Sequence, residues 1–76
     1  MTTYLIDYYF LDENGNREND YYETVELEAE SDDETTLKSV VKTYLSKMGE
    51  ARVFIKSNGE VGYCDIEIAS TFSEDN

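Results

Sequence analysis

The pattern of apolar positions along the chain predicts four strands and one helix. Residues 4–11 are rich in Tyr, Leu and Ile, and residues 21–30 alternate apolar and acidic side chains from Thr24 onward. Residues 51–57 and 60–70 have a similar strand-like composition. Between these two pairs, apolar residues recur at the spacing of one helical stripe. The stripe consists of Leu37, Val40, Val41, Tyr44, Leu45 and Met48.

Signals at both ends of the stripe predict a helix over about residues 32–48. Ser31 and Glu34 have the spacing of a capping box, in which the Ser31 hydroxyl accepts a hydrogen bond from the backbone N–H of Glu34. Lys47 falls in the last turn, and Gly49 suits the left-handed residue that follows many helices.

Two Asn-Gly dipeptides predict two-residue hairpin turns. Both central residues of such a turn need a positive φ, which Asn and Gly adopt more readily than other residues. The first turn places Tyr8 opposite Tyr21, and the second places Val53 opposite Cys64. With these registers, the strongest apolar side chains of both hairpins lie on one side of the sheet. These are Tyr4, Ile6, Tyr8, Phe10, Tyr21, Val25, Leu27, Ala51, Val53, Ile55, Cys64, Ile66 and Ile68.

The expected fold class is therefore α+β. It is a two-layer ββαββ domain, with a four-stranded antiparallel sheet and one helix packed on one face. Residues 1–70 form this single domain, and residues 71–76 form a polar C-terminal tail. The other sheet face is open and carries Tyr9, Tyr22, Phe54 and Tyr63. We expect this aromatic patch to form a homodimer or to bind a partner.

The distribution of charge predicts a second candidate binding surface. The 76 residues include 18 Asp or Glu and 6 Lys or Arg, for a net charge of -12. Residues 1–34 hold 12 of the acids and one base, so -11 of the total lies there and -1 in the remainder. We expect the following acids to act together on a partner: Glu23, Glu26, Glu28, Glu30, Asp32, Asp33 and Glu34. The plain alternative is a solvated strand face whose acidity serves only solubility.

The same composition argues against several classes of function. Direct nucleic-acid binding needs a basic surface to meet phosphates. Because the chain has no His, a single Cys64 and no Gly-rich phosphate loop, we expect neither an enzyme nor a cofactor. It also has no secretory signal and no apolar run of about 18 residues, so we expect no membrane association and a cytoplasmic location.

A further hypothesis is that the segment around the first predicted turn binds a metal ion. Oxygen-bearing side chains fall at positions 1, 3, 5, 7, 9 and 12 of a calcium-loop pattern. They are Asp12, Asn14, Asn16, Glu18, Asp20 and Glu23. However, Arg17 occupies the position where the pattern has Gly, and the flanking segments are strands rather than helices. A plain acidic turn is the favoured interpretation, with calcium binding as an alternative.

In size, acidity and lack of catalytic residues, the chain resembles in type the anti-CRISPR and anti-restriction proteins of phages and mobile elements. No motif of one family is present, so no residue role is transferred. The resemblance implies a non-enzymatic inhibitor, a DNA mimic that blocks a basic nucleic-acid-binding protein, in a bacterial host cell if a phage encodes it. The alternative is an immunity protein or antitoxin-like module that neutralises one basic partner.

Overall fold

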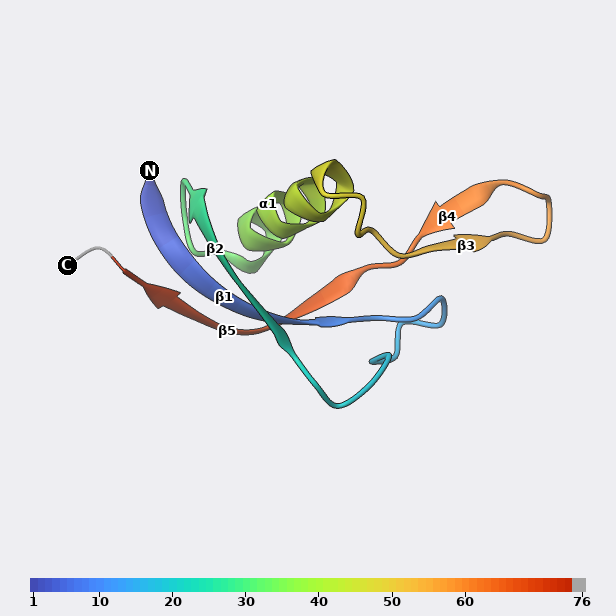
Figure 1. The fold of residues 1–76 in the computed structure, drawn as a ribbon, viewed down its shortest axis with the longest axis horizontal. Coiled ribbons are helices and arrows are strands. Elements are labelled where there is room, and N and C mark those ends of the chain that lie inside the picture. The colour runs from blue at the N-terminus through green and yellow to red at the C-terminus, as the bar shows by residue number, and fades with distance from the viewer. Residues whose placement is uncertain (75–76) are drawn as a thin grey trace.

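The computed structural model describes residues 1–74 and has one helix and two antiparallel sheets (Figure 1). The larger sheet has the strand order β2-β1-β5, and helix α1 covers one of its faces. Strands β3 and β4 form a separate hairpin that projects from one end of the molecule. The elements are β1 (Thr2–Phe10), β2 (Glu23–Ala29), α1 (Glu34–Lys47), β3 (Val53–Ile55), β4 (Val61–Tyr63) and β5 (Ile66–Ser73).

The α+β class, the single helix and the antiparallel pairing are confirmed, but the prediction of one four-stranded ββαββ sheet is wrong. The strand expected over residues 60–70 is interrupted at Cys64 and Asp65. Asp is a poor strand residue, and the Asp65 carboxylate accepts a hydrogen bond from the backbone N–H of Ile66 at 2.8 Å. Beyond this interruption the chain pairs with β1 instead of continuing the hairpin.

Strand β5 also runs further than expected. It pairs with β1 as far as Ser73, so residues 71–73 belong to the sheet and not to a polar tail. Residues 75 and 76 of the predicted tail lie outside the described residues. The register between β1 and β5 shifts by one residue after Asp7, which marks a β-bulge in β5.

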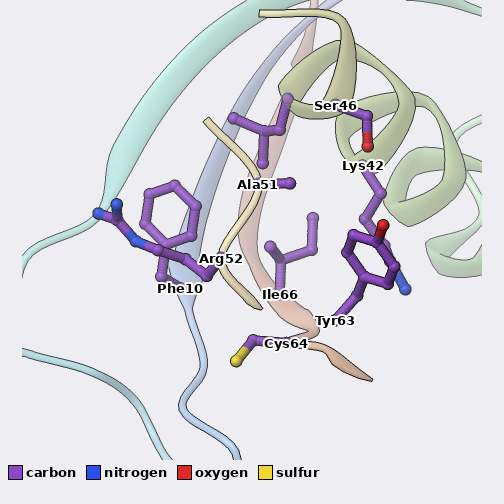
Figure 2. Close-up of a pocket in the computed structure, with 9 residues that line it drawn as sticks. Phe10, Lys42, Ser46, Ala51, Arg52, Tyr63, Cys64 and Ile66 are labelled. Atoms are coloured by element: carbon purple, nitrogen blue, oxygen red, sulfur yellow. The ribbon is translucent and has the colours of Figure 1, made fainter. Parts of the chain in front are cut away.

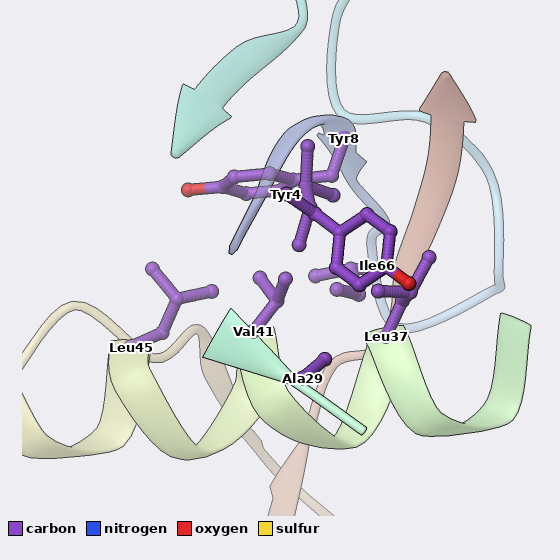
Figure 3. Packing of buried hydrophobic residues seen from close by; sticks show 8 residues of the cluster. Tyr4, Tyr8, Ala29, Leu37, Val41, Leu45 and Ile66 are labelled. Atoms are coloured by element: carbon purple, nitrogen blue, oxygen red, sulfur yellow. The ribbon is translucent and has the colours of Figure 1, made fainter. Parts of the chain in front are cut away.

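The core lies between α1 and the sheet (Figure 3). Alternate residues of β1 point toward the helix, as the period of a half-buried strand requires. Val41 and Ile66 are 0% and 2% exposed, so their predicted core positions are confirmed. The buried cluster is Tyr4, Ile6, Tyr8, Ala29, Leu37, Val41, Leu45 and Ile66. Each fully buried aliphatic side chain contributes roughly 1.5–3 kcal/mol to folding.

Both ends of α1 are capped, although the N-terminal cap differs from the prediction. The N-cap is Asp33 and not Ser31: an Asp33 carboxylate oxygen accepts from the backbone N–H of Thr36 at 3.1 Å. At the other end, Gly49 has φ +72° as predicted, and its N–H donates to the carbonyl of Ser46. Met48, predicted as the end of the buried stripe, is the C-cap and is 56% exposed. Within residues 1–74, no helix is long and apolar enough to cross a membrane.

The first hairpin turn is wider than a two-residue turn. Gly15 has φ +83°, but Asn14 does not have a positive φ, so the predicted turn type is wrong. The Asp12 carboxylate instead accepts from the backbone N–H groups of Asn14 and Asn16 and closes a three-residue loop. Beyond this turn, Tyr8 lies opposite Glu23 and not Tyr21. The shift is two residues, so the paired side chains of β1 and β2 stay on their predicted faces. Tyr21, predicted on the core side, lies outside β2 and is 81% exposed.

The second hairpin also closes through a three-residue loop, and here the consequence is larger. Gly59 has φ +88°, and Val53 lies opposite Tyr63, one residue away from the predicted Cys64. A one-residue slip turns one strand over relative to the other, so Val61 and Tyr63 share a face with Val53 and Ile55. Because the hairpin projects beyond the sheet that α1 covers (Figure 1), Val53 and Ile55, expected in the core, are 54% and 67% exposed.

Candidate partner-binding surfaces

Carboxylates line β2 and the loop that leads into α1. Glu26 and Glu28 lie opposite Leu5 and Thr3 of β1. They are exposed on the sheet face away from the helix, because Val25, Leu27 and Ala29 alternate with them and pack toward α1. Glu30 and Asp32 follow in the loop and are exposed. We call Glu26, Glu28, Glu30 and Asp32 the acidic surface.

Two of the predicted partner-binding acids have structural roles. Asp33 accepts hydrogen bonds from the hydroxyls of Ser31 and Thr36 and from the Thr36 backbone N–H. These bonds, the one from Ser31 first, lower the pKa of Asp33 to about 2. Glu34 lies 3.4 Å from Lys38 Nζ, one helical turn further on. Asp33 is therefore held by the helix start, while Glu34 keeps most of its exposure.

Glu23 lies apart from the acidic surface. It lies opposite Tyr8, on the side of the sheet that faces the helix. It lines a shallow pocket with Glu50 and Arg52. Burial, and then the charges of Glu23 and Glu50, raise the pKa of the Tyr8 hydroxyl.

Asp7, which is not among the predicted partner-binding acids, extends the acidic surface toward the middle of the sheet. One of its carboxylate oxygens accepts from the Thr24 hydroxyl, and the other accepts from the Ser70 hydroxyl, both at 2.6 Å. Thr24 belongs to β2 and Ser70 to β5, so the carboxylate is held in place from both sides. Only the strand order brings these three residues together, whereas the alternation along β1 is enough to place Asp7 on the face away from the helix.

The predicted aromatic patch is divided between two places. Tyr9 and Tyr22 make an edge-to-face contact with ring centroids 6.2 Å apart. The Arg17 guanidinium lies 3.8 Å from the Tyr9 ring centroid and forms a two-point ion pair with Glu67. The hydrogen bond from Arg17 lowers the pKa of Glu67.

Phe54 and Tyr63 are carried by the separate hairpin β3–β4 and do not join the tyrosines of the sheet. The predicted register, with Val53 opposite Cys64, would have placed Phe54 opposite Tyr63, but Phe54 lies opposite Gly62. A Cβ at Gly62 would lie 2.5 Å from the Phe54 ring, so this close contact requires Gly. The homodimer surface predicted from these four aromatic residues therefore does not exist as one patch.

The six residues of the calcium-loop pattern have other positions and partners. The carboxylate of Asp12 closes the turn, Glu18 lies 3.4 Å from Arg52, and Glu23 begins β2. Asn14, Asn16 and Asp20 are exposed. In the described part of the chain, no group of three or more His, Cys, Asp or Glu side chains is placed to hold a metal ion.

A small apolar cavity lies where the hairpin joins the body of the molecule (Figure 2). Its volume is about 90 Å³. Sites for small molecules usually measure about 300–1,000 Å³, so this cavity is too small for most ligands. Its lining includes Ile66 from the core, the partly buried Cys64, and Arg52, whose guanidinium lies 4.3 Å from the Phe10 ring centroid.

The acidic surface and the projecting hairpin thus remain as the features on which a function can be argued. No family model, curated protein or solved structure matches the chain.

Proposed function

We propose that this protein is a non-enzymatic inhibitor whose acidic surface occupies the nucleic-acid-binding groove of a basic protein. In this role it acts as a DNA mimic, like the anti-CRISPR and anti-restriction proteins of phages that it resembles in size and charge. A target of this kind places its action in the cytoplasm of a bacterial host cell.

The observation that carries the proposal is the fixed placement of the carboxylates. Glu26 and Glu28 are two residues apart on one strand, which spaces their Cα atoms by about 6.8 Å. Asp7 lies on the same face and is held by two hydroxyls. Within the described chain, the ion pairs formed by the seven predicted partner-binding acids involve Glu34 alone. The acidic surface therefore keeps its charge available for a basic partner.

A second function in the same class of binding proteins is an immunity protein or antitoxin-like module. It is supported by the tyrosine pair Tyr9 and Tyr22 and the half-buried Leu5, which lie on the open side of the sheet. A surface that combines aromatic and charged side chains is typical of protein–protein interfaces. Such a module would bind its basic partner at any site, not only in a nucleic-acid groove.

Competition with nucleic acid tests the proposal. The immobilised protein should retain a basic protein from a bacterial lysate at low salt and release it at high salt, because the attraction is screened over about 10 Å at 0.1 M. The captured protein is then bound to a labelled DNA duplex. The wild type should displace the duplex, and a variant with Glu26→Lys, Glu28→Lys and Glu30→Lys should not.

The matched control reverses three carboxylates elsewhere: Glu13→Lys, Asp20→Lys and Glu60→Lys, all exposed. It changes the net charge equally and should still displace the duplex. If both variants lose activity equally, net charge acts without a defined surface. If wild type and duplex bind the target together, the mimic proposal fails and the immunity-type module takes its place.

A further inference from the structure

Strand β2 is at one end of the strand order β2-β1-β5, so within residues 1–74 its only paired strand is β1. Hydrogen bonds of β1 show which of its residues bond to β2. The carbonyl of Thr3 accepts from the N–H of Glu74, on the β5 side of β1. The carbonyl of Phe10 accepts from the N–H of Glu18, on the β2 side. Since the backbone groups of successive residues point to opposite sides of a strand, the even-numbered residues of β1 bond to β2.

This alternation identifies the backbone groups at the outer edge of β2. The even-numbered residues of β1 lie opposite odd-numbered residues of β2. The N–H and C=O groups of Thr24, Glu26 and Glu28 therefore point away from β1. No turn, loop or cap hydrogen bond in the described chain uses these groups. An unpaired edge of this kind is a template on which another strand can pair.

A groove lies beside this edge, between β2 and α1. Its apolar lining comes from Leu27 of β2 and from Val40 and Tyr44 of α1, which are partly buried and pack against the core. Ser39, Thr43 and Lys47 complete the lining. A strand added to the edge turns every second side chain toward the helix, and the one opposite Leu27 enters the groove. Apolar residues at these alternate positions would cover the apolar lining.

The carboxylates on the other face of β2 select the remaining residues of such a strand. Glu26 and Glu28 are exposed on the face away from the helix, and no ion pair in the described chain includes them. Side chains directly opposite on paired strands have Cβ atoms about 4.5–5.5 Å apart, so opposite charges attract there and like charges repel. A second copy paired symmetrically around Glu26 would place Glu26 opposite Glu26. Charge complementarity therefore excludes this self-pairing and selects Lys or Arg.

We infer that the outer edge of β2 pairs, antiparallel, with an extended segment of the partner in which Lys or Arg alternates with apolar residues. The basic side chains face Glu26 and Glu28, and the apolar ones lie toward the groove. Backbone hydrogen bonds supply affinity and the alternate side chains supply specificity. Antiparallel pairing is slightly the more stable per residue. The inference rests on the proposed function in requiring a basic partner, but it does not require that the segment bind nucleic acid.

A synthetic peptide tests the pairing directly. The probe is acetyl-Lys-Val-Lys-Val-Lys-Val-amide, added to the wild type at up to about 1 mM, a concentration at which weak specific binding is detected. The amide protons of Thr24, Glu26 and Glu28 should change their NMR chemical shifts and exchange more slowly with solvent. The control peptide acetyl-Lys-Lys-Lys-Val-Val-Val-amide has the same composition and charge without the alternation. Its dissociation constant should be more than tenfold higher.

Methylation of the peptide backbone separates strand pairing from simple attraction between charges. In the inferred antiparallel arrangement, the backbone N–H groups of the Lys residues bond to β2 and those of the Val residues point to solvent. Methylating the Lys backbone nitrogens should raise the dissociation constant more than tenfold. Methylating the Val backbone nitrogens should change it little, although both peptides keep the same charge.

Two variants of Glu26 test the same edge on the protein. Glu26→Pro removes an N–H that points away from β1, and Pro is tolerated at such edge positions. Glu26→Gln removes the same charge but keeps the N–H. The Pro variant should bind the alternating peptide more than tenfold more weakly than the Gln variant. Circular dichroism shows whether the Pro variant is folded, and if it is not, the methylated peptides decide.

Three outcomes would overturn the inference. The first is the absence of any change at the amides of Thr24, Glu26 and Glu28. The second is equally tight binding of the alternating and the control peptides, which would indicate attraction by charge alone. The third is methylation of the Val nitrogens that weakens binding as much as methylation of the Lys nitrogens, or more. A wild type that displaces DNA from its target without binding the peptide refutes this pairing alone, and peptide binding without displacement refutes the mimic alone.

Discussion

Val41 and Ile66 show how far single residues were predictable from their spacing. Val41 belongs to the helical stripe and Ile66 to a strand alternation, and both are almost completely buried in the same cluster. Val53 has the same local pattern as Ile66 but is half exposed. Local pattern identifies a residue suited to a core, and the place of its strand relative to α1 and the larger sheet decides whether it reaches one.

Val41→Ala and Ile66→Ala should each lower the free energy of unfolding by about 1–4 kcal/mol, because truncation leaves a cavity in a tightly packed site. Val61→Ala, at a position 51% exposed, should cost much less. Urea denaturation followed by circular dichroism measures all three. A loss of only a few tenths of a kcal/mol at both Val41 and Ile66 would mean that the core is assigned wrongly.

Helix α1 was predictable from residues close together in the sequence, whereas the register of the β3–β4 hairpin was not. The helix has its own stripe, its own caps and a Gly with positive φ at its end, and it begins and ends within two residues of the prediction. The registers of the two hairpins were predicted from their turn residues alone. In both, a three-residue loop replaces the predicted two-residue turn, and in the second hairpin this extra residue puts Val61 and Tyr63 on the same face as Val53 and Ile55.

The Asp33 cap gives the helix a pH-dependent component. The folded pKa of Asp33, about 2, lies below its ordinary value of 3.8, so the contribution of the carboxylate is present above about pH 4 and is lost as the pH falls toward 2. Asp33→Asn keeps an N-cap acceptor but cannot ionise. The difference in melting temperature between wild type and Asp33→Asn should therefore shrink from pH 5 to pH 2.

Asp33→Ala supplies the control, since it removes the cap acceptor at every pH. It should melt below the Asn variant throughout this range. A difference between wild type and Asp33→Asn that stays constant from pH 5 to pH 2 would show that the hydrogen bonds at the helix start do not depend on the charge.

Charge is distributed unevenly along the length of the molecule. The acidic surface lies along β2 and the loop into α1, whereas Asp65 and Glu67 near β5 have cationic partners in Lys42 and Arg17. The slightly basic hairpin extends beyond the sheet. Self-repulsion is therefore concentrated where the carboxylates lack cations, and it destabilises the folded chain.

Salt should consequently stabilise the wild type. Its melting temperature should rise between about 0.01 M and 0.5 M NaCl, as the Debye length falls from about 30 Å to a few ångströms. The variant with Glu26→Lys, Glu28→Lys and Glu30→Lys should melt higher than the wild type at low salt and gain less from added salt. Equal salt effects in the two proteins would place the repulsion elsewhere. Calorimetry at low protein concentration keeps self-association out of the comparison.

The sequence by itself determined the helix, the β1–β2 pairing faces, the α+β class and the exposure of the acidic strand positions. These depend on short periods, caps and alternation, which act between near neighbours. The faces of β1 and β2 were predicted correctly although their register was wrong, because a shift of two residues leaves each paired side chain on the same face.

Only the tertiary structure decided the strand order, the interruption at Asp65, the placement of Asp7 between Thr24 and Ser70, and the separation of Tyr9 from Phe54. Each depends on contacts between residues far apart in the chain, or on one residue more in a turn. Turn signals such as Asn-Gly limit the possible loops but do not fix their length. The register of the β3–β4 hairpin follows from the completed set of backbone hydrogen bonds.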